Sequence, residues 1–417
     1  MPRRRAIIIG GSLGGLLAAH LMRQIGWDAV VFERNSTDLV SRGAGLGTHP
    51  ALMDVLRRIG IPFDDSMGLQ VPTVIFLDRD GRIVDERRTV RTMSAWGRLY
   101  RALRDPLPAD SYRLGMSLRR TEQDADGVTA VFADGTRERG DLLIGADGLR
   151  STVREQMLPQ VQPQYAGYVA WRVMLDEKDI PEEIRAQIFE HYSFCLPEGE
   201  LLLAYPVPGR NNETRQGERA YNIVWYRPVE PERALVDLCT DASGRHHAIG
   251  IPPPLIRPDV DAAIKQAARD LVAPQIAEIV CRSTPFFQPI YDLESPGLAF
   301  GRVAIIGDAA FVARPHMGAG VTKAALDAAS LADSIKASMD DVGSALARFE
   351  YQQRPFGCGM VELGRLEGAY LSAQLKPREQ RVGEELHRDI DSVINSHNAR
   401  RDNVRQLVAE RSRRAAG

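Results

Sequence analysis

Short apolar runs that end in glycine-rich turns recur three times along this chain. The strands that they predict occupy residues 6–9, 141–144 and 303–306, and a helical pattern follows each turn. Strand ends that open into helix N-termini are where α/β folds bind phosphates and cofactor sugars. Each turn taken alone is equally consistent with a simple surface turn, so the prediction depends on all three occurring together.

The first unit continues into a second strand and so forms a βαβ unit. Gly10-x-Ser12-x-x-Gly15 forms its turn, and Glu33 ends the second strand. Gly10 permits the tight turn, Gly15 lets helix and strand pack closely, and Glu33 accepts hydrogen bonds from ribose hydroxyls. Ser12 stands where a second glycine usually lets the backbone approach the phosphates. The unit predicts a dinucleotide site, with its strand, helix and strand at residues 6–9, 16–25 and 29–32.

The chain then departs from simple strand–helix alternation. A glycine-rich segment carries Arg42, which either steadies a ligand phosphate or is a solvated loop arginine. Arg98 lies near the start of a later helical segment. Turn pairs at residues 126–127 and 134–135 predict a β-meander that ends in the strand 141–144. Before the meander we expect a helix, a hairpin and a helix, at residues 50–59, 71–85 and 96–104.

The second and third turns each carry an aspartate. Gly145-Ala146-Asp147-Gly148 precedes a helix that Ser151 can cap, and Gly307-Asp308 precedes a helix that begins near residue 317. Asp147 and Asp308 are therefore candidate ligand-binding carboxylates.

The middle of the chain has a different composition and predicts a separate sheet with a few helices. Its strands contain many aromatic residues, and flat aromatic side chains suit a pocket for an aromatic ring. For each of them taken singly, ordinary core packing is the simpler explanation. The pocket candidates are Tyr168, Trp171, Tyr205, Trp225 and Phe286. The predicted strands are 168–175, 192–196, 201–205 and 222–226, followed by helices near 231–240 and 259–271.

Composition narrows the class of protein. The 53 basic and 55 acidic residues give a net charge of −2, which lacks the basic footprint of a nucleic-acid-binding protein. The four cysteines are far apart, so we expect reduced thiols, no metal site and a cytoplasmic protein. No apolar run reaches the ~18–20 residues that span a membrane. The charged helices expected at residues 348–366 and 380–414 suggest no chemistry, although they can support a homodimer.

The three turns in this order resemble the fingerprints of the single-component FAD-dependent aromatic hydroxylases, the group that includes para-hydroxybenzoate hydroxylase. Within that group, the chain is most similar to the bacterial hydroxypyridine monooxygenases, through residues 165–172, 204–210 and 307–316. The resemblance implies that FAD is the cofactor and that NADH or NADPH binds only transiently. The residues that it assigns to FAD are Gly10, Ser12, Leu13, Gly15, Glu33, Arg34, Arg42, Arg98, Asp147, Asp308, Gly318, Ala319 and Gly320.

The same resemblance implies an activity. The enzyme would use O2 to hydroxylate a small, electron-rich hydroxylated aromatic ring through a flavin C4a-hydroperoxide. A hydroxypyridine is the first candidate for this substrate. Hydroxylation of a phenol or hydroxybenzoate, a flavin reductase, a halogenase and an inactive nucleotide-binding protein are the alternatives. The catalytic candidates are His316, Pro315 and Tyr205, and the alternative for His316 is that it only shapes its turn.

The resemblance also implies an α/β (α+β) fold in four segments. These are a Rossmann-like FAD-binding domain with the inserted meander, a mostly β substrate domain, the second part of the FAD-binding domain, and C-terminal helices. We expect the boundaries 1–164, 165–291, 292–340 and 341–417.

Overall fold

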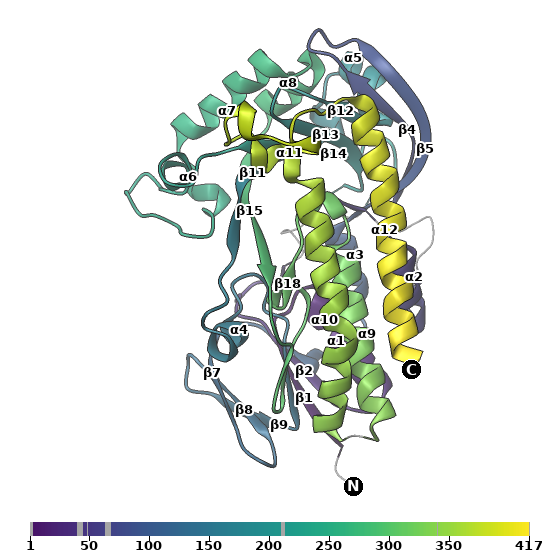
Figure 1. The fold of residues 1–417 in the computed structure, drawn as a ribbon, viewed down its shortest axis with the longest axis vertical. Coiled ribbons are helices and arrows are strands. Elements are labelled where there is room, and N and C mark those ends of the chain that lie inside the picture. Colours follow the sequence, from purple (N-terminus) through teal and green to yellow (C-terminus); the bar gives the residue numbers. More distant parts are fainter. Residues whose placement is uncertain are drawn as a thin grey trace.

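The strands lie in two large sheets and one small sheet at different levels of an elongated molecule (Figure 1). The structure, a computed structural model, describes residues 3–39, 45–47, 49–62, 68–209, 213–339 and 341–416. Helices and sheets are mixed throughout, as the sequence predicts. The α-helices are α1 Leu13–Gln24, α2 Pro50–Arg58, α3 Trp96–Arg104, α4 Thr152–Met157, α5 Glu182–Ile184, α6 Ala234–Leu238, α7 Pro258–Leu271, α8 Pro274–Arg282, α9 Gly320–Ala337, α10 Val342–Glu367, α11 Ala369–Ala373 and α12 Ile390–Ala416.

A six-stranded, mainly parallel sheet occupies the lower half of Figure 1. Its inner strands are runs of buried Val, Ile, Leu and Ala, the composition of a parallel strand that is covered on both faces. The apolar runs of the sequence thus form the centre of this sheet. In spatial order the strands are β16 Ala299–Phe300, β17 Val303–Ile305, β10 Leu142–Gly145, β1 Arg5–Ile9, β2 Asp28–Phe32 and β6 Tyr112–Arg113.

The small sheet is the predicted β-meander, and its extent corrects one expectation. The strand expected at 141–144 does not end the meander: as β10 it pairs in parallel with β1 on one side and β17 on the other. The hydrophobic pattern located this strand but cannot tell which sheet it joins. The meander itself consists of β7 Leu118–Gln123, β8 Val128–Phe132 and β9 Arg137–Gly140.

A nine-stranded sheet occupies the upper half of the molecule (Figure 1). It contains the four strands expected in the middle of the chain, and it also takes strands from residues 45–95 and 311–312. Its spatial order is β18 Phe311–Val312, β15 Phe286–Glu294, β11 Gln164–Asp176, β14 Ala220–Pro228, β13 Leu201–Val207, β12 His191–Cys195, β4 Leu69–Leu77, β5 Ile83–Ala95 and β3 Gly45–Gly47.

The two faces of the nine-stranded sheet have different cores. One face packs against apolar residues of α7 and α8. Residues of α11 and α12, Leu371 and Val393 among them, cover part of the other face. Because successive residues of a strand point to opposite faces, each side chain of this sheet belongs to one core or the other.

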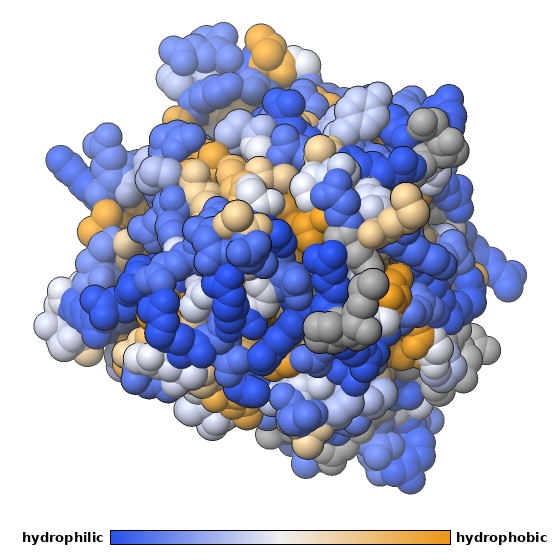
Figure 2. Space-filling model, turned by 90° about the horizontal axis from the view of Figure 1, so that it is seen from below, coloured by the Kyte–Doolittle hydropathy of each residue, from blue (hydrophilic) through white to orange (hydrophobic). Residues whose placement is uncertain are grey.

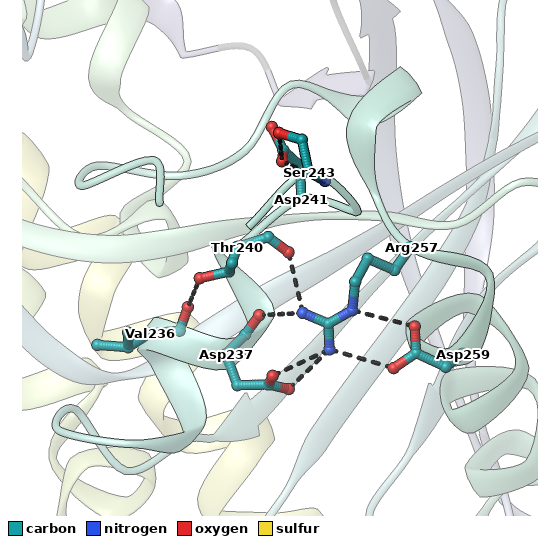
Figure 3. Close-up of polar contacts among 7 residues, drawn as sticks. All are labelled: Val236, Asp237, Thr240, Asp241, Ser243, Arg257 and Asp259. Atoms are coloured by element: carbon teal, nitrogen blue, oxygen red, sulfur yellow. Dashed lines mark hydrogen bonds and ion pairs between the residues drawn. The ribbon is translucent and has the colours of Figure 1, made fainter. Parts of the chain in front are cut away.

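The α7 side is held by a cluster of polar contacts around Arg257 (Figure 3). The guanidinium donates to both carboxylate oxygens of Asp237 on α6 and to the backbone oxygen of Thr240. It also donates to Asp259 in the first turn of α7, where an acidic residue favours the helix dipole. The cluster joins the end of α6 to the start of α7.

The helices α9, α10 and α12 run side by side along the molecule (Figure 1). Pro355 lies inside α10, and α10 continues through it. The face of the molecule seen from below is largely hydrophilic, with hydrophobic residues in small, separate patches (Figure 2). Within the described part of the chain, no helix combines the length and the apolar composition that crossing a membrane requires.

Candidate functional site

The three predicted turns lie side by side at the carboxyl ends of β1, β10 and β17. Ala146 N–H donates to Ile9 O at 2.7 Å, and Ile306 N–H donates to Gly145 O at 2.9 Å. These bonds extend the parallel pairing to the last residue of each strand. Segments 130 and more residues apart in the sequence thus form one edge, where open α/β sheets bind ligands.

The glycines of the first turn are required by geometry. Gly10 has a φ of +108°, and a Cβ there would lie 2.3 Å from the carbonyl oxygen of Ala146. A Cβ on Gly15 would lie 1.9 Å from the carbonyl oxygen of Gly10. Ser12, the N-cap of α1, has an ordinary φ of −81°, so a residue with a side chain is accommodated there. Leu13 follows as a buried first residue of the helix.

Glu33 lies beside this turn as predicted, and it is almost completely buried. Its two carboxylate oxygens accept hydrogen bonds from the backbone N–H groups of Gly11, at 2.8 Å, and Asn35, at 2.9 Å. Oε1 also accepts a hydrogen bond from the side-chain amide of Asn35, so it is Oε2 that keeps a lone pair for a further donor. Glu33 borders a cleft of about 460 Å³, which is also lined by Gly10, Ser12, Arg34, Trp96, Met116, Asp147, Gly148 and Ile249.

The second turn is tied to the start of α4. Asp147 accepts a hydrogen bond from the hydroxyl of Ser151, whose oxygen caps the helix by accepting from Arg154 N–H at 2.9 Å. Burial raises the pKa of Asp147. The buried guanidinium of Arg154 donates to Leu149 O at 2.6 Å and to Ala309 O at 3.2 Å. Arg154 therefore fastens the second turn to the third, a role that the sequence did not indicate.

The third turn holds Asp308, on the short 3₁₀ segment η7 Gly307–Ala309. The side chain is accessible to solvent, yet it lies among so many protein atoms that desolvation raises the pKa of its carboxyl. Lys323 opposes the rise in pKa and Asp327 reinforces it.

Asp327 is a site residue that the sequence prediction missed. It is buried on α9 and accepts hydrogen bonds from Gly307 N–H at 2.9 Å and from the amide of Gln353 at 2.7 Å. Its other neighbour is the buried Lys323, whose Nζ lies 3.7 Å away. Two opposite charges four residues apart in a helix of mostly small, apolar residues were the available signal.

The network continues to the last helix of the chain. Arg411 on α12 donates to Gln353 on α10 and, at 2.9 Å, to the carbonyl oxygen of Leu326 on α9. Hydrogen bonds thus connect α12, through α10 and α9, to the backbone of Gly307. The charged C-terminal segment, to which we assigned no chemistry, therefore supports the third turn.

The N-terminus of α9 follows the third turn. Gly318 has a φ of +58°, Ala319 is the N-cap, and Gly320 is the first residue of this 18-residue helix. A Cβ on Gly318 or Gly320 would meet no atom within 4 Å, so the backbone is open on that side. The free N–H groups and dipole of such a helix end attract negative charge.

His316 lies between this helix end and the nine-stranded sheet. The imidazole is buried, its Nε2 shares a 2.7 Å hydrogen bond with the hydroxyl of Tyr168, and its ring centroid lies 4.3 Å from that of Tyr226. Pro315 begins the 3₁₀ turn η8 Pro315–Met317 that carries it. Arg314 anchors this turn through a buried ion pair with Asp292 on β15.

The sheet face that carries Tyr168 and Tyr226 also carries Tyr205 and Asn222. Tyr205 lies directly opposite Asn222 in the pairing of β13 with β14, and its hydroxyl is 3.5 Å from the carbonyl oxygen of Gly45 on β3. This face therefore extends from β3 at one end to the His316 turn at the other.

Asn222 is the second residue that the sequence prediction missed. It is completely buried, and neither amide atom has a hydrogen-bond partner among the described residues. Burying a polar group unpaired costs about 1–3 kcal/mol. Its polar side chain inside the apolar run Tyr-Asn-Ile-Val-Trp-Tyr was the available signal.

Two pocket candidates lie on the opposite face of the sheet from Tyr168 and Tyr205. Trp171 and Trp225 pair with each other across β11 and β14 and belong to the core beneath α7 and α8. Trp171 is three residues from Tyr168, and an odd spacing in a strand reverses the face. The two tryptophans are therefore core residues, as the simpler alternative held. Phe286 is half-buried at the start of β15, opposite Arg172.

The three arginines predicted to contact FAD lie in different places. Arg34 is exposed and lines the cleft beside Glu33. Arg98 is half-buried in the first turn of α3, whose Trp96 lines the cleft. Arg42 lies outside the described residues. Within the described ranges, no group of three His, Cys, Asp or Glu side chains is placed to hold a metal ion.

Comparison with known proteins gives consistent results. A family described as FAD binding domain-like matches residues 165–292. The chain is 31% identical to 2,6-dihydroxypyridine 3-monooxygenase of Paenarthrobacter nicotinovorans over 82% of its length and 85% of that protein. It is 30% identical to salicylate hydroxylase of Pseudomonas putida over 70% of its length and 67% of that enzyme. The solved structure of 2,6-dihydroxypyridine-3-hydroxylase from Arthrobacter nicotinovorans superposes with a TM-score of 0.81 at 28% identity, covering 88% of this chain and 93% of that one.

Proposed function

This chain belongs to the FAD-dependent aromatic monooxygenases, and we propose that within this family it hydroxylates a hydroxypyridine. Its cofactor is FAD, and NAD(P)H is the electron donor that is general in this class. The substrate and the role of each residue belong to the proposal.

The cleft beside the first turn suits the ADP half of FAD. Backbone N–H groups at the start of α1 would face a pyrophosphate, and Gly10 lets the first turn pack closely against the second beside it. Oε2 of Glu33 has an unused lone pair for a ribose hydroxyl, and Arg34 adds a nearby positive charge. The partly apolar lining by Trp96, Met116 and Ile249 suits a flat base.

The second and third turns suit the flavin half. Asp308 is placed to accept hydrogen bonds from ribityl hydroxyls, and Asp147 helps to shape the same edge. The open backbone of residues 318–320, at the N-terminus of α9, would lie beside the ring system and stabilise negative charge on it. Arg42 and Arg98 stay predictions as contacts to the phosphates or ribose.

The substrate ring would lie on the face of the nine-stranded sheet between β3 and the His316 turn. Bound FAD supplies the redox chemistry, in which NAD(P)H is the reductant, O2 the oxidant, and one oxygen atom goes to the ring. The buried side chains of Val224, Tyr205 and Tyr226 keep water from the reacting ring.

The Tyr168–His316 pair is placed to manage the substrate proton. Burial raises the pKa of Tyr168, so its hydroxyl stays protonated at neutral pH and donates to an acceptor. In this proposal, His316 donates its Nε2 proton to the Tyr168 oxygen, which holds the imidazole in place and leaves Nδ1 to accept a proton from a ring hydroxyl. Loss of that proton makes the ring more electron-rich. Pro315 fixes the turn, and Tyr205 contributes to the wall of the pocket.

The observation that carries the proposal is the similarity to the dihydroxypyridine monooxygenase over 82% of the chain, together with the three turns at one sheet edge. The test is oxygen uptake and NAD(P)H oxidation by the holoenzyme with 2,6-dihydroxypyridine. We expect stimulated oxidation and a product heavier by one oxygen atom. Equal product formation without O2 would instead favour a reductase.

A second candidate is hydroxylation of a phenol or hydroxybenzoate. The observation in its favour is the 30% identity to salicylate hydroxylase. Parallel assays with salicylate and with 2,6-dihydroxypyridine separate the two candidates, because only the true substrate couples NAD(P)H oxidation to a hydroxylated product.

The proposal also includes the larger organisation of the protein. We place a substrate domain at residues 165–291 between two parts of an FAD-binding domain, 1–164 and 292–340, with the segment 341–417 after them. We further propose a cytoplasmic homodimer, since NAD(P)H is a cytoplasmic donor and the charged C-terminal helices offer polar contacts. Light scattering of the purified holoenzyme gives its mass in solution.

A further inference from the structure

Asn222 is a buried carboxamide whose hydrogen-bonding atoms are both unused. The side chain is fully covered, yet Nδ2 and Oδ1 have no partner among the described residues. Buried side-chain amides are nearly always paired, so an orphan of this kind requires an explanation. A ligand that pairs both atoms would provide one.

Strand alternation fixes the direction of this side chain. On β14, Tyr221 and Trp225 belong to the core beneath α7 and α8, whereas Val224 and Tyr226 belong to the opposite face. Asn222 is an even number of residues from Val224 and Tyr226, so it points to that opposite face. This is the face on which the substrate ring would lie.

Asn222 lies in the middle of the sheet face on which we place the substrate ring. Tyr205 stands directly opposite on β13 and reaches Gly45 on β3. Four residues along β14, Tyr226 contacts the His316 ring. Asn222 therefore lies between the two ends of the face.

Arg172 adds a second unused group on this face. It is half-buried on β11, two residues from Ala170 and four from Tyr168, both of which are in the core on this side. Its Nε is buried and has no hydrogen-bond partner among the described residues. Its positive charge favours the ionised form of the neighbouring Tyr205, against the effect of burial.

We propose that Asn222 recognises a cyclic-amide edge of the substrate, that is, a ring N–H next to a ring carbonyl. A carboxamide presents one acceptor and one donor side by side, and a 2-pyridone presents the complementary pair. Oδ1 accepts from the ring N–H, and Nδ2 donates to the adjacent carbonyl oxygen. Arg172 then faces the negative charge of a second, ionised ring oxygen.

This inference rests on the proposed function and makes it more specific. A benzene ring with the same hydroxyl groups has no ring N–H, so it would leave Oδ1 of Asn222 buried and unpaired. A site built to pair a substrate N–H or O–H discriminates strongly against an analogue that lacks it. The pocket would therefore select pyridones over phenols.

A matched pair of ligands tests the inference in the FAD-loaded enzyme. The dissociation constants of 2,6-dihydroxypyridine and of resorcinol, which differ only in the ring nitrogen, are measured from the change in flavin absorbance. We expect the wild type to prefer the pyridine by about tenfold or more, the effect of one or two buried hydrogen bonds. Asn222→Leu removes both hydrogen-bonding atoms and should abolish most of this preference, and Asn222→Asp should reduce it.

Tyr221→Phe is the control, because this hydroxyl lies on the same strand but bonds to Ser193 and Ile188 on the other face. It should keep the wild-type preference, and FAD per chain shows that each variant is folded. The inference is overturned if the Asn222 variants bind FAD and keep the preference for the pyridine. It is also overturned if the wild type hydroxylates both rings and binds them with equal affinity. If the wild type binds neither ring, the proposed function fails as well.

Discussion

At the scale of single residues, the most informative group is the Asp308 carboxylate. It must be charged to accept strong hydrogen bonds from sugar hydroxyls, but its position within the protein disfavours the charge. A carboxyl whose pKa is raised by desolvation is more typical of a binding site than of a structural position. A ligand that donates hydrogen bonds would remove this penalty.

We therefore predict that Asp308→Ala weakens FAD retention more than it weakens folding. Losing hydrogen bonds to a charged group costs about 1.5–3 kcal/mol, or roughly tenfold to a hundredfold in FAD affinity. The measurement is FAD per chain after gel filtration, together with the melting temperature of the apoprotein. Asp308→Asn, of nearly the same shape, should retain FAD better than Asp308→Ala. Full occupancy in the alanine variant would contradict this role.

The sequence predicted individual turn residues where backbone geometry requires one residue type, and their roles toward a ligand stay predictions. Gly10, Gly15 and Glu33 were found because the tight turn and close packing permit few alternatives at those positions. Arg154 and Asp327 were missed because the backbone groups of the third turn that they bind lie 155 and 20 residues away in the sequence. A buried charge is recognisable only when the group that it pairs with is known.

At the scale of elements, the first turn and α1 depend on close contact between backbones. Within α1, Gly15 packs on the carbonyl of Gly10, whereas an added Cβ on Gly14 would meet only the Ala324 methyl group at 3.5 Å. A Cβ on Gly15 would therefore overlap the Gly10 carbonyl, whereas a Cβ on Gly14 would make an ordinary van der Waals contact.

These neighbouring glycines give a matched prediction. Gly15→Ala should shift α1 away from β1, lower stability by about 1–3 kcal/mol and reduce FAD binding. Gly14→Ala should leave both nearly unchanged, because alanine favours a helix. Urea unfolding and FAD titration of the two variants provide the check. Similar behaviour of the two would show that the contact at Gly15 does not matter.

The C-terminal helix makes a second prediction at this scale. Arg411→Ala breaks the hydrogen bonds to Gln353 and Leu326 and leaves buried acceptors unpaired, at a cost of about 1–3 kcal/mol. The melting temperature should fall by a few degrees, and FAD should dissociate faster because Gln353 supports Asp327. Arg405→Ala, on the exposed side of α12, is the control and should change neither value. An Arg411 variant indistinguishable from this control would contradict the network.

Elements were easier to predict than their assembly. The lengths of the apolar runs and the positions of glycine located the inner strands of the parallel sheet, the meander and most long helices of the first 340 residues, but β15 and α8 were not predicted. The partner of each strand depends on contacts that hydrophobic periodicity does not encode. For this reason β10 was assigned to the meander, and the contribution of β4 and β5 to the nine-stranded sheet was not foreseen.

At the scale of the whole molecule, the two large sheets meet at one place. β15 leads from the nine-stranded sheet towards β17, and the ion pair of Asp292 with Arg314 fixes the His316 turn against β15. Ser372, on α11, accepts a hydrogen bond from Arg314 at 2.8 Å. The carboxyl edge of one sheet, the face of the other that carries Tyr168, and the C-terminal helices therefore converge on residues 307–320.

We expect this convergence to perform oxygen transfer from O2 to a hydroxypyridine ring. The measurement is the mass of the product formed from 2,6-dihydroxypyridine by the holoenzyme with NADH or NADPH under ¹⁸O₂. One ¹⁸O atom should appear in each product molecule, with one NAD(P)H consumed for each. Product without ¹⁸O, or NAD(P)H oxidation with no hydroxylated ring for any hydroxypyridine or hydroxybenzoate, would contradict it.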